Sequence, residues 1–385
     1  MNKTVIIFSA LYLPSAYGVE RYTDNLAHKL SRRGYNVKII TCNLFNLSYY
    51  EKIDNIEVFR VPCIKLLGGR FPITLYSKKL RNTLKKIKKQ GADLVIINTR
   101  FYVNSLVGAL FSRFNKFKSI VIEHGTSHFS VNSIVFDFLG HIYEHFITFL
   151  IKRCCKNFYG VSKSCNKWLN HFNINAEGVL YNSINIESID KIELNKETYR
   201  DKYRIDKNDI VVVFVGRLVK EKGILNLLDA FKLLLENQKN IHLFVAGDGI
   251  LLNTAMENEN SNIHILGKIE FENVIRLLKE SDIYCLPTQY AEGFPTSLLE
   301  AAATRNFIVT TDRGGSKELI RDNSYGIILN DINKQTIKQA LEECINNKRY
   351  RINAINKSYE LLIQNFEWEK TSQKVIELIR ERCLK

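Results

Sequence analysis

Short apolar runs rich in β-branched residues alternate with helical segments along this chain, and the alternation occurs twice. Runs that are apolar from end to end are typical of strands buried on both faces, and strands separated by helices form parallel sheets. The pattern therefore predicts an α/β protein with two doubly wound, Rossmann-like domains that face a cleft. The predicted strands cover residues 4–9, 37–41, 57–61, 94–98, 119–123 and 158–161 in the first half, and residues 210–215, 241–246, 262–267, 282–288, 307–312 and 325–329 in the second.

With 385 residues, the chain is long enough for two domains of ordinary size. We place the join near residues 182–191, before the charged segment LNKETYRDKYRIDKND. The predicted N-terminal domain is then 1–187 and the C-terminal domain 188–365, followed by a helix within 366–385. Because open α/β sheets bind ligands beyond the carboxyl ends of their strands, residues that follow strands are the candidates for function.

The positive charge of the chain is confined to one half. Residues 1–187 contain 26 Lys and Arg against 11 Asp and Glu, which accounts for the whole net charge of +15. A basic half is typical of a protein that meets nucleic acid, an anionic membrane surface or an acidic substrate. The sequence contains no identifiable nucleic-acid recognition module, so we expect no nucleic-acid partner.

The eight cysteines form no C-x-x-C pairs with matching histidines, and the sequence therefore predicts no metal site. The N-terminus enters an apolar strand directly, without the pattern of a signal peptide, and we expect a cytoplasmic protein. We also expect no membrane-spanning helix. The most apolar segment, residues 133–151, is interrupted by acidic residues and histidines and predicts an amphipathic or half-buried helix.

The segment GRLVKEKG follows the predicted strand 210–215 and contains two cations near a sharp turn at Gly216. An Arg side chain binds phosphate with a bidentate fork, and a Lys side chain supplies a compact charge. Arg217 and Lys222 could together neutralise a diphosphate. The same residues would suit an ordinary loop with solvated cations, so this segment alone does not define a phosphate site.

The segment YAEGFPTSLLEA places Glu292 and Glu300 on either side of Pro295. Proline fits the start of a helix and not its interior, so Glu292 should lie on a loop and Glu300 inside the following helix. The helix start directs free N–H groups at an anion, while Glu300 could accept two hydrogen bonds from a ribose diol. The alternative is a loop charge and an ordinary helical residue. The remaining candidates around this helix start are Gly293, Phe294 and Thr296.

Two residues of the first half also follow strands. His124 in IEHGTSH could present an imidazole to the cleft, although a single histidine is more often structural. Gly18, before the first helix, would allow close approach of a ligand to the backbone. The chain contains neither G-x-G-x-x-G after its first strand nor a P-loop sequence, which argues against a nicotinamide or P-loop protein.

Together these segments resemble the retaining glycosyltransferases of family 4, the group 1 class, which have the GT-B fold. The resemblance extends over nearly the whole chain, and the glutamate pair of EGFPTSLLEA is its most specific part. VGRLVKEKGILNLLDAF resembles the diphosphate-binding segment of this family, and TTDRGGSKELI its Gly-Gly segment. FEWEKTSQKVIELI resembles the C-terminal helix that returns to the N-terminal domain.

The resemblance implies a role for each candidate residue. Arg217 and Lys222 would bind the donor diphosphate, and Glu300 would hold the ribose. Glu292 would hold the donor sugar. The catalytic set would be Arg217, Lys222, Glu292 and His124, and the donor-binding set Gly18, Gly216, Gly293, Phe294, Pro295, Thr296 and Glu300. No Asp-x-Asp occurs in the chain, so cations and the helix start would replace a metal, and no cofactor is expected beyond the nucleotide-sugar donor, a UDP-sugar by preference.

In this family the N-terminal domain binds the acceptor, which makes the basic half the acceptor half. The expected acceptor is a glycan or a lipid-diphosphate-linked glycan, with a peripheral position on the inner face of the plasma membrane. The basic helix 77–90, with Leu80, Leu84 and Ile87 on one face, could rest on an anionic leaflet; an ordinary surface helix is the alternative. Two other functions remain open: a non-catalytic GT-B scaffold in a glycan assembly complex, and a nucleotide-sugar epimerase.

Overall fold

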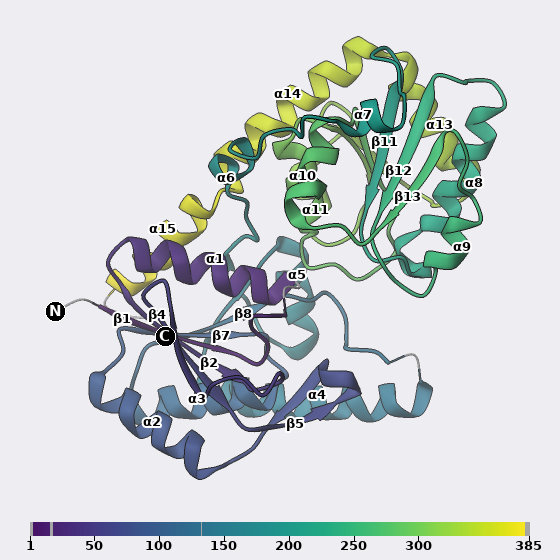
Figure 1. Ribbon diagram of the computed structural model, residues 1–385. Coiled ribbons are helices and arrows are strands. Elements are labelled where there is room, and N and C mark those ends of the chain that lie inside the picture. Colours follow the sequence, from purple (N-terminus) through teal and green to yellow (C-terminus); the bar gives the residue numbers. More distant parts are fainter. Residues whose placement is uncertain (1–2, 16–17, 132, 382–385) are drawn as a thin grey trace. The chain divides into compact units, whose positions relative to one another are not determined.

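The structure is a computed structural model that describes residues 3–15, 18–131 and 133–381. The chain forms two compact units (Figure 1). The N-terminal unit comprises residues 1–182 and 368–385, and the C-terminal unit comprises residues 183–367. The sequence-based division placed the first boundary after residue 187 and the start of the terminal segment at residue 366.

The N-terminal unit is built on an eight-stranded sheet with the order β10-β9-β8-β7-β1-β2-β4-β3. All neighbouring strands are parallel except β3, which runs antiparallel to β4 at the edge, and β5 and β6 form a separate antiparallel hairpin. The strands are β1 (Thr4–Ser9), β2 (Asn36–Cys42), β3 (Tyr50–Ile53), β4 (Ile56–Val61), β5 (Cys63–Leu66), β6 (Phe71–Thr74), β7 (Leu94–Asn98), β8 (Ser119–Glu123), β9 (Asn157–Gly160) and β10 (Gly178–Val179).

Helices cover both faces of this sheet. Successive strand residues such as Val5 and Ile6 point to opposite faces and are buried in two separate hydrophobic cores. The helices α1 and α15 close one core, and α2, α3 and α4 close the other (Figure 1). The helices are α1 (Gly18–Arg32), η1 (Leu67–Gly69), α2 (Lys78–Gln90), α3 (Val103–Asn115), α4 (Ile134–Cys154), α5 (Lys163–Leu169), η2 (Asn170–Phe172) and α15 (Trp368–Arg380).

The C-terminal unit contains a wholly parallel six-stranded sheet with the order β13-β12-β11-β14-β15-β16. The helices α8, α9 and α13 lie on one face, and α10, α11 and α14 on the other (Figure 1). The strands are β11 (Ile210–Val215), β12 (Ile241–Ala246), β13 (Ile263–Gly267), β14 (Ile283–Leu286), β15 (Phe307–Thr311) and β16 (Ile327–Leu329). The helices are α6 (Ile186–Asp190), α7 (Tyr199–Lys202), η3 (Lys220–Lys222), α8 (Ile224–Leu235), α9 (Leu252–Met256), α10 (Phe271–Lys279), α11 (Thr296–Ala303), α12 (Ser316–Leu319), α13 (Lys334–Asn346) and α14 (Lys348–Asn365).

Each sheet has one point where the chain reverses its direction of travel across the strands. In the N-terminal unit this switch point lies between β1 and β7, and in the C-terminal unit between β11 and β14. The loops that leave two such strands turn to opposite faces and open a crevice at the carboxyl edge of the sheet, where α/β proteins place ligands. The predicted fold class is confirmed, and the switch points locate the candidate sites.

The apolar face of α2 is not available to a lipid surface. Leu80 and Ile87 are fully buried in the core between α2 and the sheet, and Leu84 packs against the same core. Burying a leucine or isoleucine side chain stabilises the fold by roughly 1.5–3 kcal/mol, so this face is not released to a lipid surface. The lysines of α2 remain on the outside, as on an ordinary surface helix.

The helix α4 differs from α2 because much of its apolar surface is exposed. By length and composition alone it could cross a membrane, and 22% of its apolar window is buried. The second half packs on the sheet through Ile147 and Ile151, whereas Ile134, Phe136 and Phe138 of the first half are 92%, 68% and 64% exposed. Asp137, one of the acidic residues that interrupt the segment, accepts hydrogen bonds from Ser130 and Val131.

Candidate functional site

The predicted cations lie at the switch point of the C-terminal unit. Gly216 directly follows β11, and its N–H donates to the carbonyl of Ala246 on the neighbouring strand β12. The side chain of Arg217 is exposed at this edge, while Lys222 at the end of η3 is only 9% exposed. A buried ammonium needs a counter-charge or a ligand because its desolvation is costly.

Glu292 supplies this counter-charge. Its Oε1 accepts a hydrogen bond from Lys222 Nζ, and the side chains of Glu292 and Lys222 are 14% and 11% exposed. The ring of Tyr290 lies close to both cations, with its centroid 4.9 Å from Arg217 Cζ and 5.5 Å from Lys222 Nζ. An aromatic face within about 6 Å of a cation attracts it electrostatically. The loops after β11 and β14 therefore form one cluster of two cations, a carboxylate and a phenol ring.

The start of α11 lies in the same loop as this cluster. Pro295 is its N-cap, Thr296 its first residue, and no side chain caps the helix. The first N–H groups of a helix have no partner within it and carry part of the positive end of the helix dipole. Glu300 lies in the second turn and is 5% exposed among buried leucine and alanine residues. The predicted loop and helix positions of the two glutamates are confirmed.

Glycines of two other loops fix the backbone around the cluster. Gly314, after β15, has a φ of +57°, and a Cβ there would lie 2.6 Å from the carbonyl oxygens of Glu292 and Gly293. Gly315 donates its N–H to the Gly293 carbonyl at 3.0 Å, and a Cβ on it would meet the ring of Phe294 at 2.5 Å. Only glycine fits such contacts. The Gly-Gly segment thus packs closely against the Glu292–Phe294 loop and helps to fix its backbone.

His124 belongs to the N-terminal unit and lies near the switch point of its sheet. Its ring Nε2 lies 3.2 Å from Asn98 Oδ1, and Tyr22 packs against it edge to face with ring centroids 4.7 Å apart. Asn98 also donates to Thr23, so its oxygen accepts from the histidine Nε2–H. Burial lowers the pKa of His124 to about 3, and the imidazole is therefore neutral at pH 7.

Gly18, the other predicted residue of this unit, is the first residue of α1. Among the described residues, apart from its chain neighbours and the backbone of its own helix, no atom lies within 4 Å of the position that a Cβ would take there. Its neighbours residues 16 and 17 lie outside the described residues. The surroundings of Gly18 therefore do not demand a glycine for packing, and a requirement for one would have to come from a ligand.

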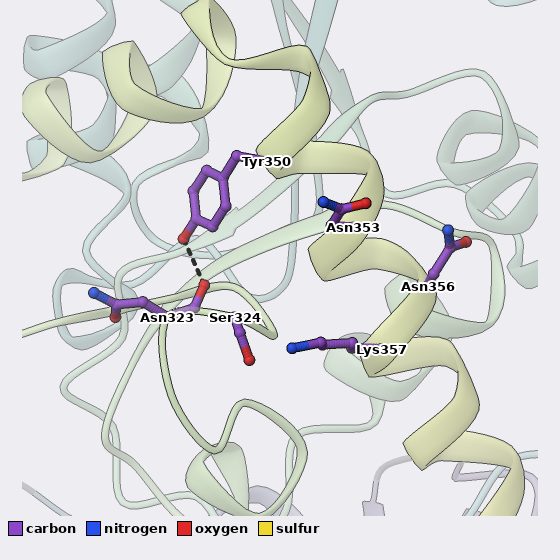
Figure 2. A pocket seen from close by; sticks show the side chains of 6 residues that line it. All are labelled: Asn323, Ser324, Tyr350, Asn353, Asn356 and Lys357. Atoms are coloured by element: carbon purple, nitrogen blue, oxygen red, sulfur yellow. Dashed lines mark hydrogen bonds between the residues drawn. The ribbon is translucent and has the colours of Figure 1, made fainter.

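A separate pocket of about 580 Å³ lies between α14 and the turn before β16. Figure 2 shows Tyr350, Asn353, Asn356 and Lys357 extending from α14, with a hydrogen bond between the Tyr350 hydroxyl and the Asn323 residue. The hydroxyl donates to the Asn323 carbonyl at 2.7 Å. None of the predicted site residues lines it. The amide and hydroxyl groups of this pocket form no cluster of opposite charges comparable to that of Lys222 and Glu292.

Sequence reasoning missed Tyr290 as an aromatic ring beside both cations and did not assign Gly314 and Gly315 to the site. The structure brings Arg217, Lys222 and Glu292 together with the start of α11 within the C-terminal unit. His124 and Gly18 belong to the other unit.

Two doubly wound units with parallel sheets are the architecture of the GT-B fold. A glycosyltransferase of Rickettsia africae has the same fold, with a TM-score of 0.74 and 19% identity over 98% of both chains. Anabaena HepE, solved in complex with UDP, matches with a TM-score of 0.72 and 17% identity over 99% of this chain and 100% of its own.

The family follows from the sequence matches. The model of Glycosyltransferase Family 4 matches residues 16–188, and that of Glycosyl transferases group 1 matches residues 195–361. An uncharacterized glycosyltransferase of Methanocaldococcus jannaschii is 30% identical over 379 residues, which is 95% of each chain. The capsular polysaccharide biosynthesis glycosyltransferase CapM of Staphylococcus aureus is 25% identical over 54% of this chain and 58% of its own. The chain belongs to glycosyltransferase family 4, the group 1 class, and its activity is that of a transferase.

Proposed function

We propose that the protein transfers a hexose or N-acetylhexosamine from a nucleotide-sugar, a UDP-sugar by preference, to a hydroxyl of a surface glycan, with retention of configuration. The observation that carries this proposal is the cluster of Arg217, Lys222, Tyr290 and Glu292 beside the uncapped start of α11. The preference for UDP is supported by HepE, whose solved structure contains UDP. A glycan acceptor is supported by the similarity to CapM, a glycosyltransferase of capsular polysaccharide biosynthesis.

The donor would be held by groups of different chemistry along its length. Glu300, buried in α11, would accept hydrogen bonds from the ribose hydroxyls. Arg217, Lys222 and the N–H groups of α11 would surround the diphosphate, since cations and a helix start both favour anions. Glu292 would accept from hydroxyls of the donor sugar, with the backbone of Gly293 and Phe294 beside it.

The chemical step would depend on stabilising the departing diphosphate. In the donor, the bond between the sugar and the diphosphate breaks, and negative charge develops on the departing phosphate. Preorganised cations stabilise this charge more in the transition state than in the ground state. Lys222 is already held in place by Glu292 and Tyr290 and needs little reorganisation. The departing phosphate would accept the proton of the attacking hydroxyl on the same face of the sugar, which gives retention.

Two acidic residues of the N-terminal unit that could act as a base, Asp93 and Glu123, are engaged in other contacts, which supports this front-face route. Asp93 accepts from the N–H of Thr4 at the start of β1, at the amino edge of the sheet. Glu123 contacts Arg100 and accepts from the N–H groups of His124 and Gly125. His124 is neutral, and with Gly18 it keeps the role implied by the family, contact with the donor sugar.

Transfer is expected to need no divalent ion at the donor diphosphate. Treatment with excess EDTA should leave the initial rate of transfer from a UDP-sugar within about twofold of the untreated rate, because Arg217, Lys222 and α11 supply the positive charge. The measurement is the release of UDP in the presence of a glycan acceptor, across a panel of UDP-sugars. A rate abolished by EDTA and restored by Mg²⁺ would contradict metal independence.

We further propose a cytoplasmic protein that is peripheral to the inner face of the plasma membrane, with a lipid-linked glycan acceptor. The exposed first half of α4 would enter the lipid interface, where apolar helical faces bind. The same unit holds the excess of basic residues, which favours an anionic leaflet. Arg153, in the last turn of α4, adds positive charge beside the exposed ring of Phe149, with its Cζ 4.2 Å from the ring centroid.

The double variant Phe136→Ser/Phe138→Ser is expected to bind anionic vesicles at least about tenfold more weakly than the wild type, since each ring loses more than about 1 kcal/mol of apolar burial. Flotation with phosphatidylglycerol-containing vesicles measures the bound fraction. Ile250→Ser, at a side chain 85% exposed in the C-terminal unit, is the matched control and should bind as the wild type does. Equal binding of the double variant and the control would exclude α4 as the contact.

A further inference from the structure

Four of the eight histidines of the chain gather at one place in the N-terminal unit, apart from His124. His128 lies in the loop after β8, His141 and His145 lie one turn apart on α4, and His171 lies in η2. Side-chain nitrogens of His128, His145 and His171 all lie within 4.8 Å of one another. Three segments that are distant in sequence thus present imidazoles to a common point.

We propose that His128, His145 and His171 bind a divalent transition-metal ion of the zinc type, with water in the fourth position. Imidazole nitrogens are preferred ligands of such ions. The site lies outside the donor cluster, and the proposal revises the sequence-based expectation of no metal site.

The geometry of the rings agrees with a tetrahedral ion. The ring centroids of the three histidines are 5.0, 5.1 and 5.5 Å apart in pairs. Three imidazoles that bind one tetrahedral ion at the usual Zn–N distance have centroids about 5 Å apart, and their ligand nitrogens lie about 3.3 Å apart. The Nε2 atoms of His128 and His171 are 3.1 Å apart. Two of the ligands therefore already have nearly the required separation.

A buried carboxylate fixes the protonation of His128. Glu144 is 1% exposed, and its Oε2 lies 3.0 Å from His128 Nδ1 and 3.1 Å from an Arg100 nitrogen. Glu144 Oε1 accepts from the N–H of Phe129 at 2.7 Å. With its proton on Nδ1 and donated to Glu144, His128 directs the Nε2 lone pair to the point that His171 also faces. Carboxylates that orient metal-binding histidines in this way are a regular feature of zinc sites.

The burial of the cluster suits an ion that enters from solvent. His128 is half-buried, whereas His145 and His171 are exposed. Without an ion, His171 can donate its Nε2–H to His128; with an ion, both Nε2 lone pairs turn to the metal. The bound ion would fasten the loop after β8 to α4 and η2, and its binding would stabilise the folded unit. The fourth histidine, His141, stacks on His128 with centroids 4.0 Å apart and is not a ligand.

Metal content and affinity of untagged full-length protein test this site. After removal of bound metal with a chelator, titration with Zn²⁺ against a chromophoric competitor should show one ion per chain, and Co²⁺ should give the visible absorption of tetrahedral coordination. Thermal unfolding should shift upward by a few degrees with Zn²⁺. His145→Gln and His171→Gln should each weaken binding at least about tenfold, and the double variant should lose it.

His141→Gln is the matched control, because it removes a histidine of the same cluster without removing a ligand. It should keep one ion per chain, as should His28→Gln on α1. These readouts need no nucleotide-sugar, so their failure is distinct from a failure of the proposed transferase activity. No stoichiometric binding to the wild type, or binding unchanged in the His145→Gln/His171→Gln variant, would overturn the metal site.

Discussion

Replacing Lys222 by alanine is expected to lower kcat/KM for glycosyl transfer by about a thousandfold. The loss of one preorganised donor at a developing negative charge costs about 10²–10³ in rate, and an ammonium that is 9% exposed acts with little solvent screening. Because the charge on the departing phosphate grows in the transition state, the larger part of the effect should fall on kcat. Steady-state release of the nucleoside diphosphate measures both constants.

Two further variants separate this effect from a loss of folding. Lys220→Ala removes an exposed lysine from the same short helix η3 and should keep the wild-type rate. Lys222→Ala removes the cation that pairs with the half-buried Glu292, which would destabilise the unit. Lys222→Ala/Glu292→Gln also removes the carboxylate charge and should recover stability without recovering activity. Wild-type transfer by folded Lys222→Ala would exclude Lys222 from the catalytic step.

Replacing Glu300 by glutamine is expected to weaken binding of the nucleoside diphosphate by about a hundredfold. The carboxylate is 5% exposed in α11 and would accept two hydrogen bonds from the ribose, each worth roughly 1.5 kcal/mol or more as a hydrogen bond to a charged group. Glutamine keeps the size of the side chain but has one acceptor oxygen and adds a competing donor. Isothermal titration measures the change in Kd.

Glu292→Gln should lower the rate of transfer and leave the binding of UDP intact, whereas Glu300→Gln should weaken the binding of UDP. It removes the carboxylate that pairs with Lys222, so the lysine is free for the phosphate and UDP should bind as tightly as before or more tightly. Transfer should fall nonetheless, because the donor sugar loses its charged acceptor. If Glu292→Gln lost UDP while Glu300→Gln kept it, the two glutamates would have the reverse of the assigned roles.

Local patterns were sufficient to predict the two sheets and the position of the glutamate pair. Apolar runs such as IVVVFV and IHLFVA are β11 and β12 as expected, because near-continuous β-branched residues suit strands covered on both faces. Pro295 separates the loop of Glu292 from the helix of Glu300 through its fixed backbone geometry. The edge strands β3 and β10 and the hairpin β5–β6 were missed, since their short, mixed sequences have no such continuous pattern.

Tertiary contacts decided what the sequence could not show. The spacing of Leu80, Leu84 and Ile87 indicates an amphipathic helix but not whether its apolar face meets a core or a membrane, and the structure places it in the core. The ring of Tyr290 joins Arg217 and Lys222 only because the loops after β11 and β14 meet. In the histidine cluster, His141 and His145 share a helix face, a spacing visible in the sequence, but His128 and His171 join them only through folding.

The most direct test of the proposed donor site is ligand-observed NMR of UDP, GDP, ADP and CMP, with their common sugar conjugates, against the wild type and Glu300→Gln. The donor-site proposal predicts that the wild type binds a nucleoside diphosphate and its sugar conjugate, with UDP preferred, and that Glu300→Gln loses this binding. If none of these nucleotides binds the folded wild type, the cluster of Arg217, Lys222 and Glu292 is not a nucleotide-sugar site, and the proposed transfer reaction is contradicted.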